Sequence, residues 1–570
     1  RYTFADNGGL SNAVTRVERL EDGVVVEYTA QEQIEQVVRE ETQHRFTLAA
    51  SSPLCNGLLG EQLGYLADTD VARSILDGTF VAPEGVSDST ILVLEEIARI
   101  ASIIQRGAVR LVLTPAEYVS YWSAVHERTS SSRSTIHFGH YKVTAKSDRF
   151  ATFFARKLSF IARTGWAPSR WGTGLTVLLE KIAGLALVNK LRAILLFEAD
   201  SNMFNSYIFG QRAMEMARTH NLIPQEQYAE RQSDGQDGAW LKRLFADISR
   251  QLRIAIGIVS ADAEQCYDRI AHVFASLVYQ AFGVFISAVI VMLFSIQHMK
   301  FYLRTGLGES AGYMTAVLGS IIQGLCQGNT AAPAGWSLIS AVLIKVYKSF
   351  GHGAYFQAPI SRECYDTAGV LYVDDVDLFT MRSSLVTKEL WKEVASSTES
   401  WTELLTVPGG SGKGEKCFGY LLDYAWDDTG AWYYAPVEDM ELNIVLPDGS
   451  KEGIVLLPHT ASRVTLGIST SPDGDDSHHL QAPGKPRDKW RSVSTRASNW
   501  LDRLKNGHLP PKYSWVSYRL QLWSSIRYGL GTLSAPLSTL GELTTNFAFR
   551  ALPYLGVNRN IRAEWRYLHN

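Results

Sequence analysis

The segment Ala368-Gly-Val-Leu-Tyr-Val-Asp-Asp-Val-Asp-Leu-Phe-Thr380 has the pattern of two strands joined by a tight turn. The first half, Val370 to Val373, is apolar and largely β-branched, and the second half, Val376 to Thr380, alternates. Between them lie two adjacent acids, Asp374 and Asp375, which repel each other unless a cation is bound. Hard cations take such oxygen ligands. An isolated Asp-Asp pair is more commonly a solvated turn, so other parts of the chain must distinguish the two cases.

A third acid ends a strongly apolar run. Ile254 to Asp262 reads as a buried strand that finishes on Asp262, and Ala-Glu-Gln-Cys-Tyr267-Asp268-Arg269 follows, leading into a long helix that ends near Phe282. A charge at the end of a buried strand needs a partner or a metal. Farther along, the glycine-rich run Gly324-Leu-Cys-Gln-Gly328 precedes a helix predicted over Ala334 to Lys348. Glycines there let the backbone approach a ligand closely.

Composition places the chain among globular proteins and excludes several classes. Its 570 residues are enough for several domains, with 46% hydrophobic and 20% charged residues. We find no run of 18 apolar residues, so no transmembrane segment is expected. The five cysteines lack CxxC spacing, which argues against zinc and disulfides and favours a reducing, intracellular compartment. The first residue is Arg1, so the chain is expected to be a piece of a longer product with further domains.

Charge is unevenly distributed along the chain. Residues 1–106 carry 8 Lys and Arg against 17 Asp and Glu, a net charge of −9. Residues 478–570 carry 14 against 4, a net charge of +10. This asymmetry indicates a C-terminal part that binds a polyanion, the alternative being a solvated basic helical face. Upstream, Lys181, Lys190 and Arg192 punctuate strand-like runs and can meet a triphosphate from one face, unless they are solvated edge-strand cations.

Together these motifs resemble the reverse transcriptases, most closely those of non-LTR retroelements. Tyr372-Val-Asp-Asp375 matches the family's Y-x-D-D, and Asp262 to Arg269 resembles its D-x-x-x-A-F-D-R box. Gly324 to Pro333 resembles G-x-x-Q-G-x-x-x-S-P, with Ala332 in place of Ser. The loop of Lys413 and Lys416 resembles the lysine-bearing segment that follows the catalytic hairpin. The boxes occur in the family's order over residues 111–477, which also contain a strand-rich insert, about 423–457, that the family pattern leaves unassigned.

The resemblance implies a role for each site residue. Asp262 and Asp374 would coordinate two Mg²⁺ ions, with Mn²⁺ as the alternative, while Asp375 supports them and the Ala263 carbonyl completes a shell. Tyr267 stands where the family places its steric gate against a ribose 2′-hydroxyl. The remaining assignments are nucleotide contacts from Lys181, Lys190, Arg192, Gln327 and Gly328, and a primer grip at Leu466-Gly467, in a short strand from Val464 to Ile468. Asp377 shares the face of Asp375 by alternation, but the family pattern gives it no role.

The expected fold class is α+β, a right-hand polymerase with fingers, a palm of antiparallel sheet backed by helices, and a helical thumb. Residues 1–110 would form an independent α-rich N-terminal extension, and residues 111–253 the fingers and the approach to the palm. The palm would span 254–477, with the strand-rich insert inside it. The basic helical thumb would span 478–570.

The expected activity is that of an RNA-directed DNA polymerase, a magnesium-dependent nucleotidyltransferase of a retrotransposon, with RNA template, DNA primer and dNTPs as partners and no membrane. The resemblance also implies that the protein acts in the nucleus. Two alternatives stay open: a viral-type RNA-dependent RNA polymerase, and a catalytically silent RNA-binding scaffold with a polymerase fold. We recognise no endonuclease or ribonuclease H constellation in the sequence.

Overall fold

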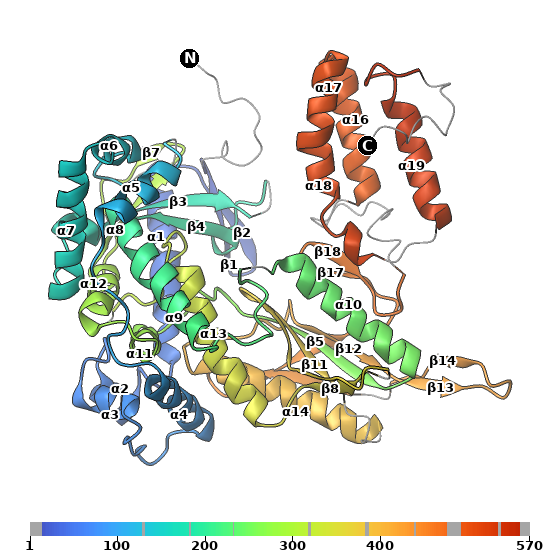
Figure 1. Cartoon of the computed structure of the whole chain (residues 1–570), viewed down its shortest axis with the longest axis horizontal. Coiled ribbons are helices and arrows are strands. Elements are labelled where there is room, and N and C mark those ends of the chain that lie inside the picture. The colour runs from blue at the N-terminus through green and yellow to red at the C-terminus, as the bar shows by residue number, and fades with distance from the viewer. Residues whose placement is uncertain are drawn as a thin grey trace.

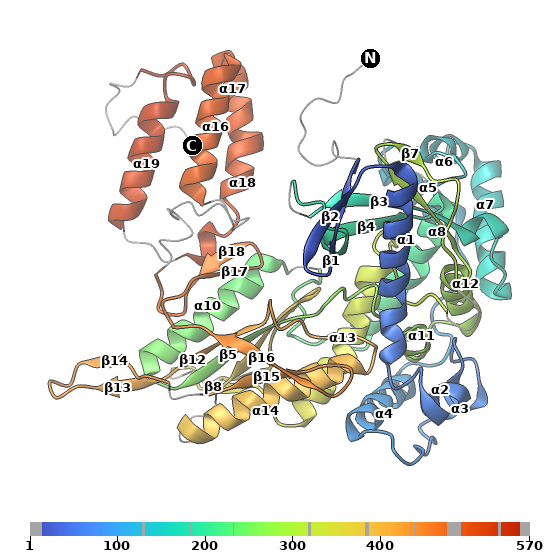
Figure 2. The same ribbon diagram turned by 180° about the vertical axis from the view of Figure 1, so that it is seen from behind.

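The computed structural model describes residues 14–127, 132–181, 184–231, 233–316, 321–358, 360–381, 387–437, 440–475, 492–533 and 537–558. Helices and several sheets are combined throughout, which confirms the α+β class (Figures 1 and 2). A six-stranded sheet lies low in Figure 1. Two parts rise above it: an upper lobe made of helices and a smaller sheet, and a separate helical bundle. In the described part of the chain, every helix is too short or too polar to cross a membrane.

The central sheet has the strand order β10-β11-β5-β12-β16-β15. Its strands are β5 (Ile256–Asp262), β10 (Gly369–Tyr372), β11 (Asp375–Thr380), β12 (Phe418–Leu422), β15 (Leu442–Val445) and β16 (Lys451–Leu456). Neighbouring strands are antiparallel except β12 and β16, which run parallel. The predicted insert is therefore partly a continuation of this sheet, because β15 and β16 extend it. Outside it, the same part of the chain forms the hairpins of β8 (Ala354–Gln357) with β9 (Cys364–Thr367), β13 (Tyr424–Trp426) with β14 (Trp432–Tyr434), and β17 (Arg463–Thr465) with β18 (Ile468–Thr470).

Helices cover both faces of the central sheet. Successive side chains of its strands point to opposite faces, and apolar residues occur on both. On one face lies α10 (Gly235–Leu252), where Phe245 stacks on Phe379 with ring centroids 4.5 Å apart. On the other lies α14 (Thr387–Thr406), which contacts β5, β11 and β15. The backbone between β5 and the next helix forms turns, and α11 runs from His272 to Ala281, which confirms the helix expected after Arg269 with its end near Phe282.

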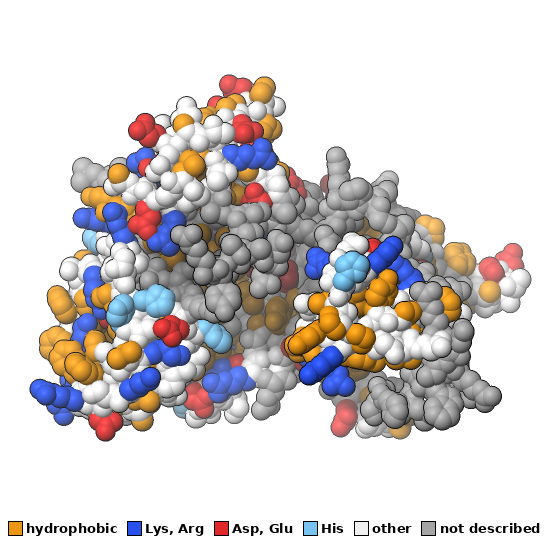
Figure 3. Space-filling view, turned by 90° about the horizontal axis from the view of Figure 1, so that it is seen from above, with side chains coloured by type: hydrophobic (Ala, Val, Ile, Leu, Met, Phe, Trp, Pro, Cys, Tyr) orange, Lys and Arg blue, Asp and Glu red, His pale blue; other side chains and the backbone are white. Residues whose placement is uncertain are grey.

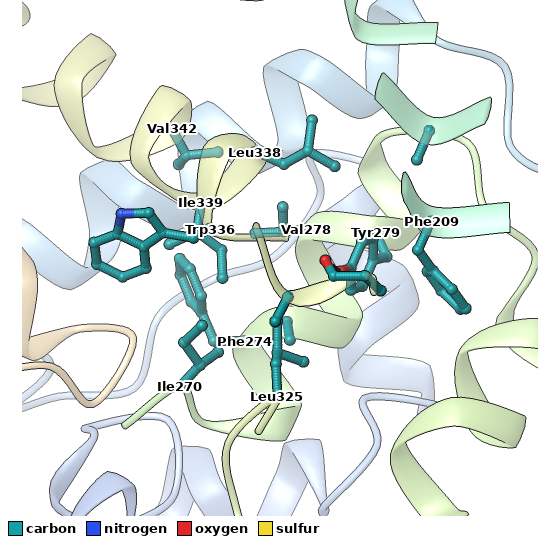
Figure 4. Close-up of a cluster of buried hydrophobic side chains, with 14 of the residues drawn as sticks. Phe209, Ile270, Phe274, Val278, Tyr279, Leu325, Trp336, Leu338, Ile339 and Val342 are labelled. Atoms are coloured by element: carbon teal, nitrogen blue, oxygen red, sulfur yellow. Dashed lines mark hydrogen bonds between the residues drawn. The ribbon is translucent and has the colours of Figure 1, made fainter. Parts of the chain in front are cut away.

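Behind α14 lies the main hydrophobic core. It is built from α11 (His272–Ala281), α12 (Ile286–Gln297) and α13 (Ala332–Ser349). Figure 4 shows Phe274 and Val278 of α11 packed toward Trp336 and Ile339 of α13, with Leu325 of the glycine-rich turn beside Phe274. This packing fixes the glycine-rich turn against the helix that follows Asp262, and so places two of the sequence boxes next to each other.

The N-terminal residues do not form a core of their own, contrary to the independent segment expected. They comprise the strands β1 (Val17–Glu21) and β2 (Val24–Tyr28) and the helices α1 (Gln31–Thr47), η1 (Leu48–Ser51), α2 (Gly57–Leu63), α3 (Asp70–Leu76) and α4 (Asp88–Ile103). α4 packs on α11 and α13, and side chains from Phe46 to Leu113 belong to the main core. The Ser52 hydroxyl donates to the Val407 carbonyl at 2.6 Å, which ties η1 to the end of α14.

The upper lobe contains a second sheet, of order β4-β3-β6-β7. Its elements are α5 (Pro115–Ala124), α6 (Phe138–Thr144), α7 (Asp148–Thr164), η2 (Ser169–Gly172), β3 (Thr173–Glu180), η3 (Val188–Lys190), β4 (Leu191–Leu196), α8 (Ala199–Asn205), η4 (Ser206–Ala213), α9 (Met214–Thr219), β6 (Lys300–Thr305) and β7 (Gly308–Glu309). α5 begins with a reciprocal capping box formed by Thr114 and Glu117. β1, α1 and the sheet share a small core around Leu178 and Leu303.

The C-terminal helices form a bundle with its own core. Its elements are α16 (Val493–Gly507), α17 (Pro511–Ser517), η5 (Tyr518–Trp523), α18 (Ser524–Ile526), η6 (Leu530–Thr532) and α19 (Leu537–Ala551). Trp500 and Leu504 of α16 pack there against Leu522 and Ala551. The predicted helical character is confirmed for the described residues. Residues 476–491, 534–536 and 559–570 of the predicted thumb and its approach lie outside them.

Candidate active site

The Asp374-Asp375 pair is divided between a turn and a strand. Tyr372 pairs with Asp375, so the two-residue turn consists of Val373 and Asp374, and Asp375 is the first residue of β11. The expectation that both acids lie in the turn is thus corrected by one position. Val373 has φ of 56°, which is rare for a β-branched residue. The Trp336 indole donates a hydrogen bond to its carbonyl, so the strained turn is fixed from α13.

Three acids meet at this end of the sheet. Asp262 lies directly opposite Asp375 in the β5–β11 ladder, which places their Cβ atoms about 5 Å apart on one face. The Ala263 N–H donates to the Asp374 carbonyl at 3.4 Å. Desolvation, and then the negative charges of Asp374, Asp377 and Asp262, raise the pKa of Asp375 to about 7. An acid whose pKa rises because of neighbouring acids marks a site where negative charge is concentrated.

Lysines from the loop after α14 approach these acids. Lys416 forms an ion pair with Asp262, and the Lys413 backbone N–H donates to the Asp262 carbonyl at 3.3 Å. The Lys413 ammonium lies 2.9 Å from Glu264, which also pairs with Arg269 at 2.7 Å. The sequence predicted a lysine-bearing segment here, and the structure brings it to the strand that carries Asp262. Glu264 holds this loop through its ion pair with Lys413, and the sequence did not predict that role.

Two of the three predicted triphosphate cations belong to this site. Lys181 follows the end of β3, and Arg192 lies opposite Leu179 on β4. Desolvation, then the charges of Lys416 and Arg192, lower the pKa of Lys181, and Asp262 and Asp374 oppose that shift. Lys181 is thus close enough to Asp262 and Asp374 for their charges to affect its pKa. Lys190 ends the short turn η3 and is exposed, and no interaction links it to the acids among the described residues.

The glycine-rich turn joins the second sheet to the loop after Asp262. The Leu325 N–H donates to the Tyr267 carbonyl at 2.7 Å, and the Leu195 N–H donates to the Gln327 carbonyl at 2.7 Å. Gly328 has φ of 108°, and a Cβ there would lie 2.1 Å from the Leu195 carbonyl oxygen. Only glycine fits this position. Tyr267, in the loop after β5, and Gln327, in the glycine-rich turn, are both half-buried.

Asp268 does not face the acid site. Its side chain is buried, 3% exposed, and desolvation raises its pKa to about 6, opposed by the charge of Arg45 and a backbone hydrogen bond from Gln327. Arg45 is itself buried near the end of α1. The N-terminal helix therefore supplies the counter-charge for an acid in the box after β5. No sequence pattern pointed to this relationship, because the two residues lie far apart in the chain.

Leu466 and Gly467 form a hairpin turn, which corrects the continuous strand expected from Val464 to Ile468. Thr465 pairs with Ile468, and Leu466 and Gly467 have φ of 51° and 77°. Such a turn requires positive φ at both central residues. The Tyr528 hydroxyl donates to the Leu466 carbonyl at 2.8 Å, so the C-terminal bundle is attached at this turn.

A buried lysine connects this hairpin to the acids. Lys242 of α10 lies 2.8 Å from Asp377 and 3.0 Å from the Thr465 hydroxyl. Alternation correctly predicted that Asp377 shares the face of Asp375, but its partner was not predicted. Lys242 opposes the rise in the pKa of Asp375. The pair is thus a structural support for the acid site.

The donor set suits a hard cation, although the side chains do not form a closed cage. Asp262, Asp374 and Asp375 offer carboxylate oxygens, and their mutual repulsion favours a bound cation. Across the described residues, no group of three or more His, Cys, Asp or Glu is arranged to hold a metal ion. Lys416 engages Asp262 instead. The metal site stays a prediction.

Comparison with known proteins adds no family assignment. No protein-family model matches the chain, and no curated protein matches it either. The resemblance to reverse transcriptases therefore rests on the motifs and on their geometry: the Asp262–Asp375 register, the turn at Asp374, and the glycine-rich turn against Tyr267.

Proposed function

We propose that this protein is an RNA-directed DNA polymerase, with the central sheet as its palm, the upper lobe as its fingers and the C-terminal bundle as its thumb. The observation that carries the proposal is the direct pairing of Asp262 with Asp375 beside the Asp374 turn. Three carboxylates at adjacent strand ends are the arrangement that nucleotidyl transfer by two metal ions requires.

Each part of the site has a role in this reaction. Divalent cations bound by Asp262, Asp374 and the Ala263 carbonyl would supply the Lewis acidity that activates a primer 3′-hydroxyl and stabilises pyrophosphate. Lys181 and Arg192 approach the acids from the upper lobe and would neutralise the triphosphate, as would Lys190 if the lobe closes. Asp375 concentrates negative charge at the cation site.

The other predicted residues would position the substrates. Tyr267 lies in the loop after β5, and Gln327 and Gly328 lie in the glycine-rich turn that is hydrogen-bonded to that loop, which suits a pocket for the nucleotide and its template base. The Leu466–Gly467 turn, held by α10 and by Tyr528, would support the primer end. Desolvation, then the charge of Asp234 and the Tyr372 side chain, raise the pKa of Tyr528, so the bundle and the catalytic hairpin are close together.

Primer extension tests this proposal. Purified protein is given an RNA template, a DNA primer, Mg²⁺ and dNTPs, and the wild type is expected to extend the primer. Asp374→Ala should abolish extension, while Asp428→Ala, an exposed acid in the turn between β13 and β14, should extend like the wild type. Equal extension by Asp374→Ala would contradict the site assignment and favour a different active centre, and no extension by any variant would favour the silent scaffold.

The structure bears on the alternative of an RNA-dependent RNA polymerase. In that reading Asp268 would recognise a ribose 2′-hydroxyl from the active site. Asp268 is instead buried, and desolvation raises the pKa of its carboxyl against the charge of Arg45 and a hydrogen bond from the Gln327 backbone, which lower it. This placement favours dNTP over NTP as substrate. Incorporation of each on the same RNA template separates the two functions, and preferential use of NTPs would contradict the proposal.

A further inference from the structure

The outward face of α7 carries an alternating row of arginine and phenylalanine. Arg149, Phe153, Arg156, Phe160 and Arg163 are spaced four, three, four and three residues apart, so they lie on one side of the helix. All five are exposed, with Phe153 at 60% and Phe160 at 52%. We call these five residues the α7 stripe. It spans about 21 Å along the helix axis.

The opposite face of α7 accounts for how the helix is held. Ala155, Leu158 and Ile161 are buried, and the helix packs on α5 and α12. Lys157 turns inward, where its ammonium lies 3.6 Å from the buried Asp200. The stripe is therefore not needed to attach the helix, and its rings are exposed for some other reason. Aromatic rings are stabilised when a partner buries them, so a row of exposed rings indicates an interaction surface.

The charges of the stripe are also uncompensated. Within the described residues Arg149 and Arg156 form no ion pair, and Arg163 donates only to the Ser159 backbone carbonyl, at 3.3 Å. An open depression is bordered by four of the stripe residues, all but Arg163, and by their neighbours Asp148, Thr152 and Lys157. Figure 3 shows hydrophobic and basic side chains intermixed over this left-hand lobe. The surface thus presents cations and rings together, with a single acid at its N-terminal edge.

We propose that the α7 stripe binds single-stranded RNA. Bases stack on aromatic rings while arginine guanidinium groups meet the phosphates, which is how single strands are bound without sequence preference. The choice of RNA rests on the proposed function, since a polymerase that copies RNA must hold template outside its active site. The stripe lies on the outer side of the lobe that carries Lys181 and Arg192, so it would hold RNA away from the acids.

Two other partners fit the pattern less well. A helix that lies on a membrane separates its rings from its cations on different faces, whereas here each ring has an arginine on both sides along one row. The centre of a protein–protein interface is depleted of charge, which disagrees with Arg156 between Phe153 and Phe160. Alternation of charge and ring therefore favours a ligand that itself alternates between phosphate and base.

Photocrosslinking of the full chain tests the proposal. A single-stranded RNA of roughly 16 nucleotides containing 4-thiouridine is crosslinked and the modified peptides are mapped. Crosslinks are expected in peptides from residues 148–166. Crosslinks confined to other segments would overturn the proposal. Because Asp374→Ala lies outside the stripe, it should keep these crosslinks. Primer extension is measured separately, so absence of polymerase activity and absence of RNA on α7 are distinguished.

Variants of the stripe supply a quantitative readout. Phe153→Ala/Phe160→Ala should weaken binding of this RNA about thirtyfold or more, measured by fluorescence anisotropy. Replacing the three arginines by Gln should reduce the salt dependence of log K by about 2, the value for three phosphate contacts on a single strand. Phe350→Ala, an exposed ring at the end of α13, is the matched control. All variants should melt like the wild type, because the changed residues are exposed.

Three results would overturn the proposal: unchanged affinity in the Phe double variant, an unchanged salt slope in the arginine variant, or displacement of the RNA from α7 by anionic phosphatidylserine vesicles. The last result would mean that the stripe belongs to a lipid surface.

Discussion

Lys242 and Asp377 form a buried ion pair between α10 and β11. The lysine Nζ lies 2.8 Å from Asp377 Oδ1, and the two side chains are 8% and 3% exposed. The same ammonium donates to the Thr465 hydroxyl at 3.0 Å, next to the Leu466–Gly467 turn. Strand β11 carries Asp375 two residues before Asp377. This one lysine therefore links the strand of the acid site to the hairpin at which the C-terminal bundle is attached.

Removing one partner of this pair should be costly. Lys242→Met leaves a buried carboxylate uncompensated, and we expect a loss of about 3–5 kcal/mol in the free energy of unfolding. Lys242→Met/Asp377→Leu removes both charges and should recover most of that loss. Urea denaturation of the three proteins measures the effect. If the double variant is no more stable than Lys242→Met, the pair does not act as a unit.

The pH dependence of stability should change when Asp375 is replaced. Its pKa is about 7 in the folded protein, against an ordinary value of 3.8. Between these values the folded protein retains a proton that the unfolded chain has released. The contribution of this group to the free energy of unfolding therefore decreases as the pH rises from about 4 to about 7.

Asp375→Asn should remove that decrease. Metal-free wild type should lose more stability between pH 5 and pH 8 than the variant, as measured by urea midpoints. Asp428→Asn serves as the control, since that acid is exposed far from the site. Parallel pH profiles for the wild type and Asp375→Asn would contradict the raised pKa.

Gly328 should not tolerate a side chain. A Cβ would lie 2.1 Å from the Leu195 carbonyl oxygen at a backbone φ of 108°, so either β4 or the glycine-rich turn must shift. We expect Gly328→Ala to lower the free energy of unfolding by about 2–4 kcal/mol. Gly541→Ala is the control, because that glycine is exposed on α19 with no atom within 4 Å, and helix propensity there favours Ala. Comparable melting temperatures for the two variants would contradict the close packing.

Tyr267 should determine the choice of sugar if the proposed function is right. Tyr267→Val shortens the side chain that would meet a ribose 2′-hydroxyl. The variant should use NTPs better relative to dNTPs by about one to two orders of magnitude. Single-nucleotide incorporation on one RNA template measures the ratio, with the wild type and Tyr302→Val compared in parallel. An unchanged ratio in Tyr267→Val would exclude the steric role.

Local signals in the sequence predicted many elements correctly. The apolar run that ends on Asp262 predicted a buried strand, and the structure has β5 there. The hairpin that carries Asp374 was also predicted, because alternation and a tight turn are readable over a dozen residues. Its turn was misplaced by one residue, since the choice of turn depends on cross-strand hydrogen bonds that the sequence does not state.

Relations between distant residues could not be predicted. Pairing of Phe418 with Val455 makes β16 part of the central sheet, although the strand-rich insert had no assignment. The Lys242–Asp377 pair and the Arg45–Asp268 relationship join residues that no motif connects. The run from Val464 to Ile468 predicts a strand because Val, Thr and Ile are β-branched. The observed hairpin turn depends instead on Gly467 and on packing of Leu466 against α10.

The core shared by the N-terminal helices and the central sheet determines how the molecule should come apart. Side chains from Phe46 to Ile454 belong to one hydrophobic cluster, while the C-terminal bundle has a separate one. Local units of a protein unfold together when they share a core. We therefore expect two cooperative transitions, one for the body and one for the bundle. In hydrogen exchange, α4 should be as protected as β5, and a protease should release the bundle before it releases any N-terminal fragment.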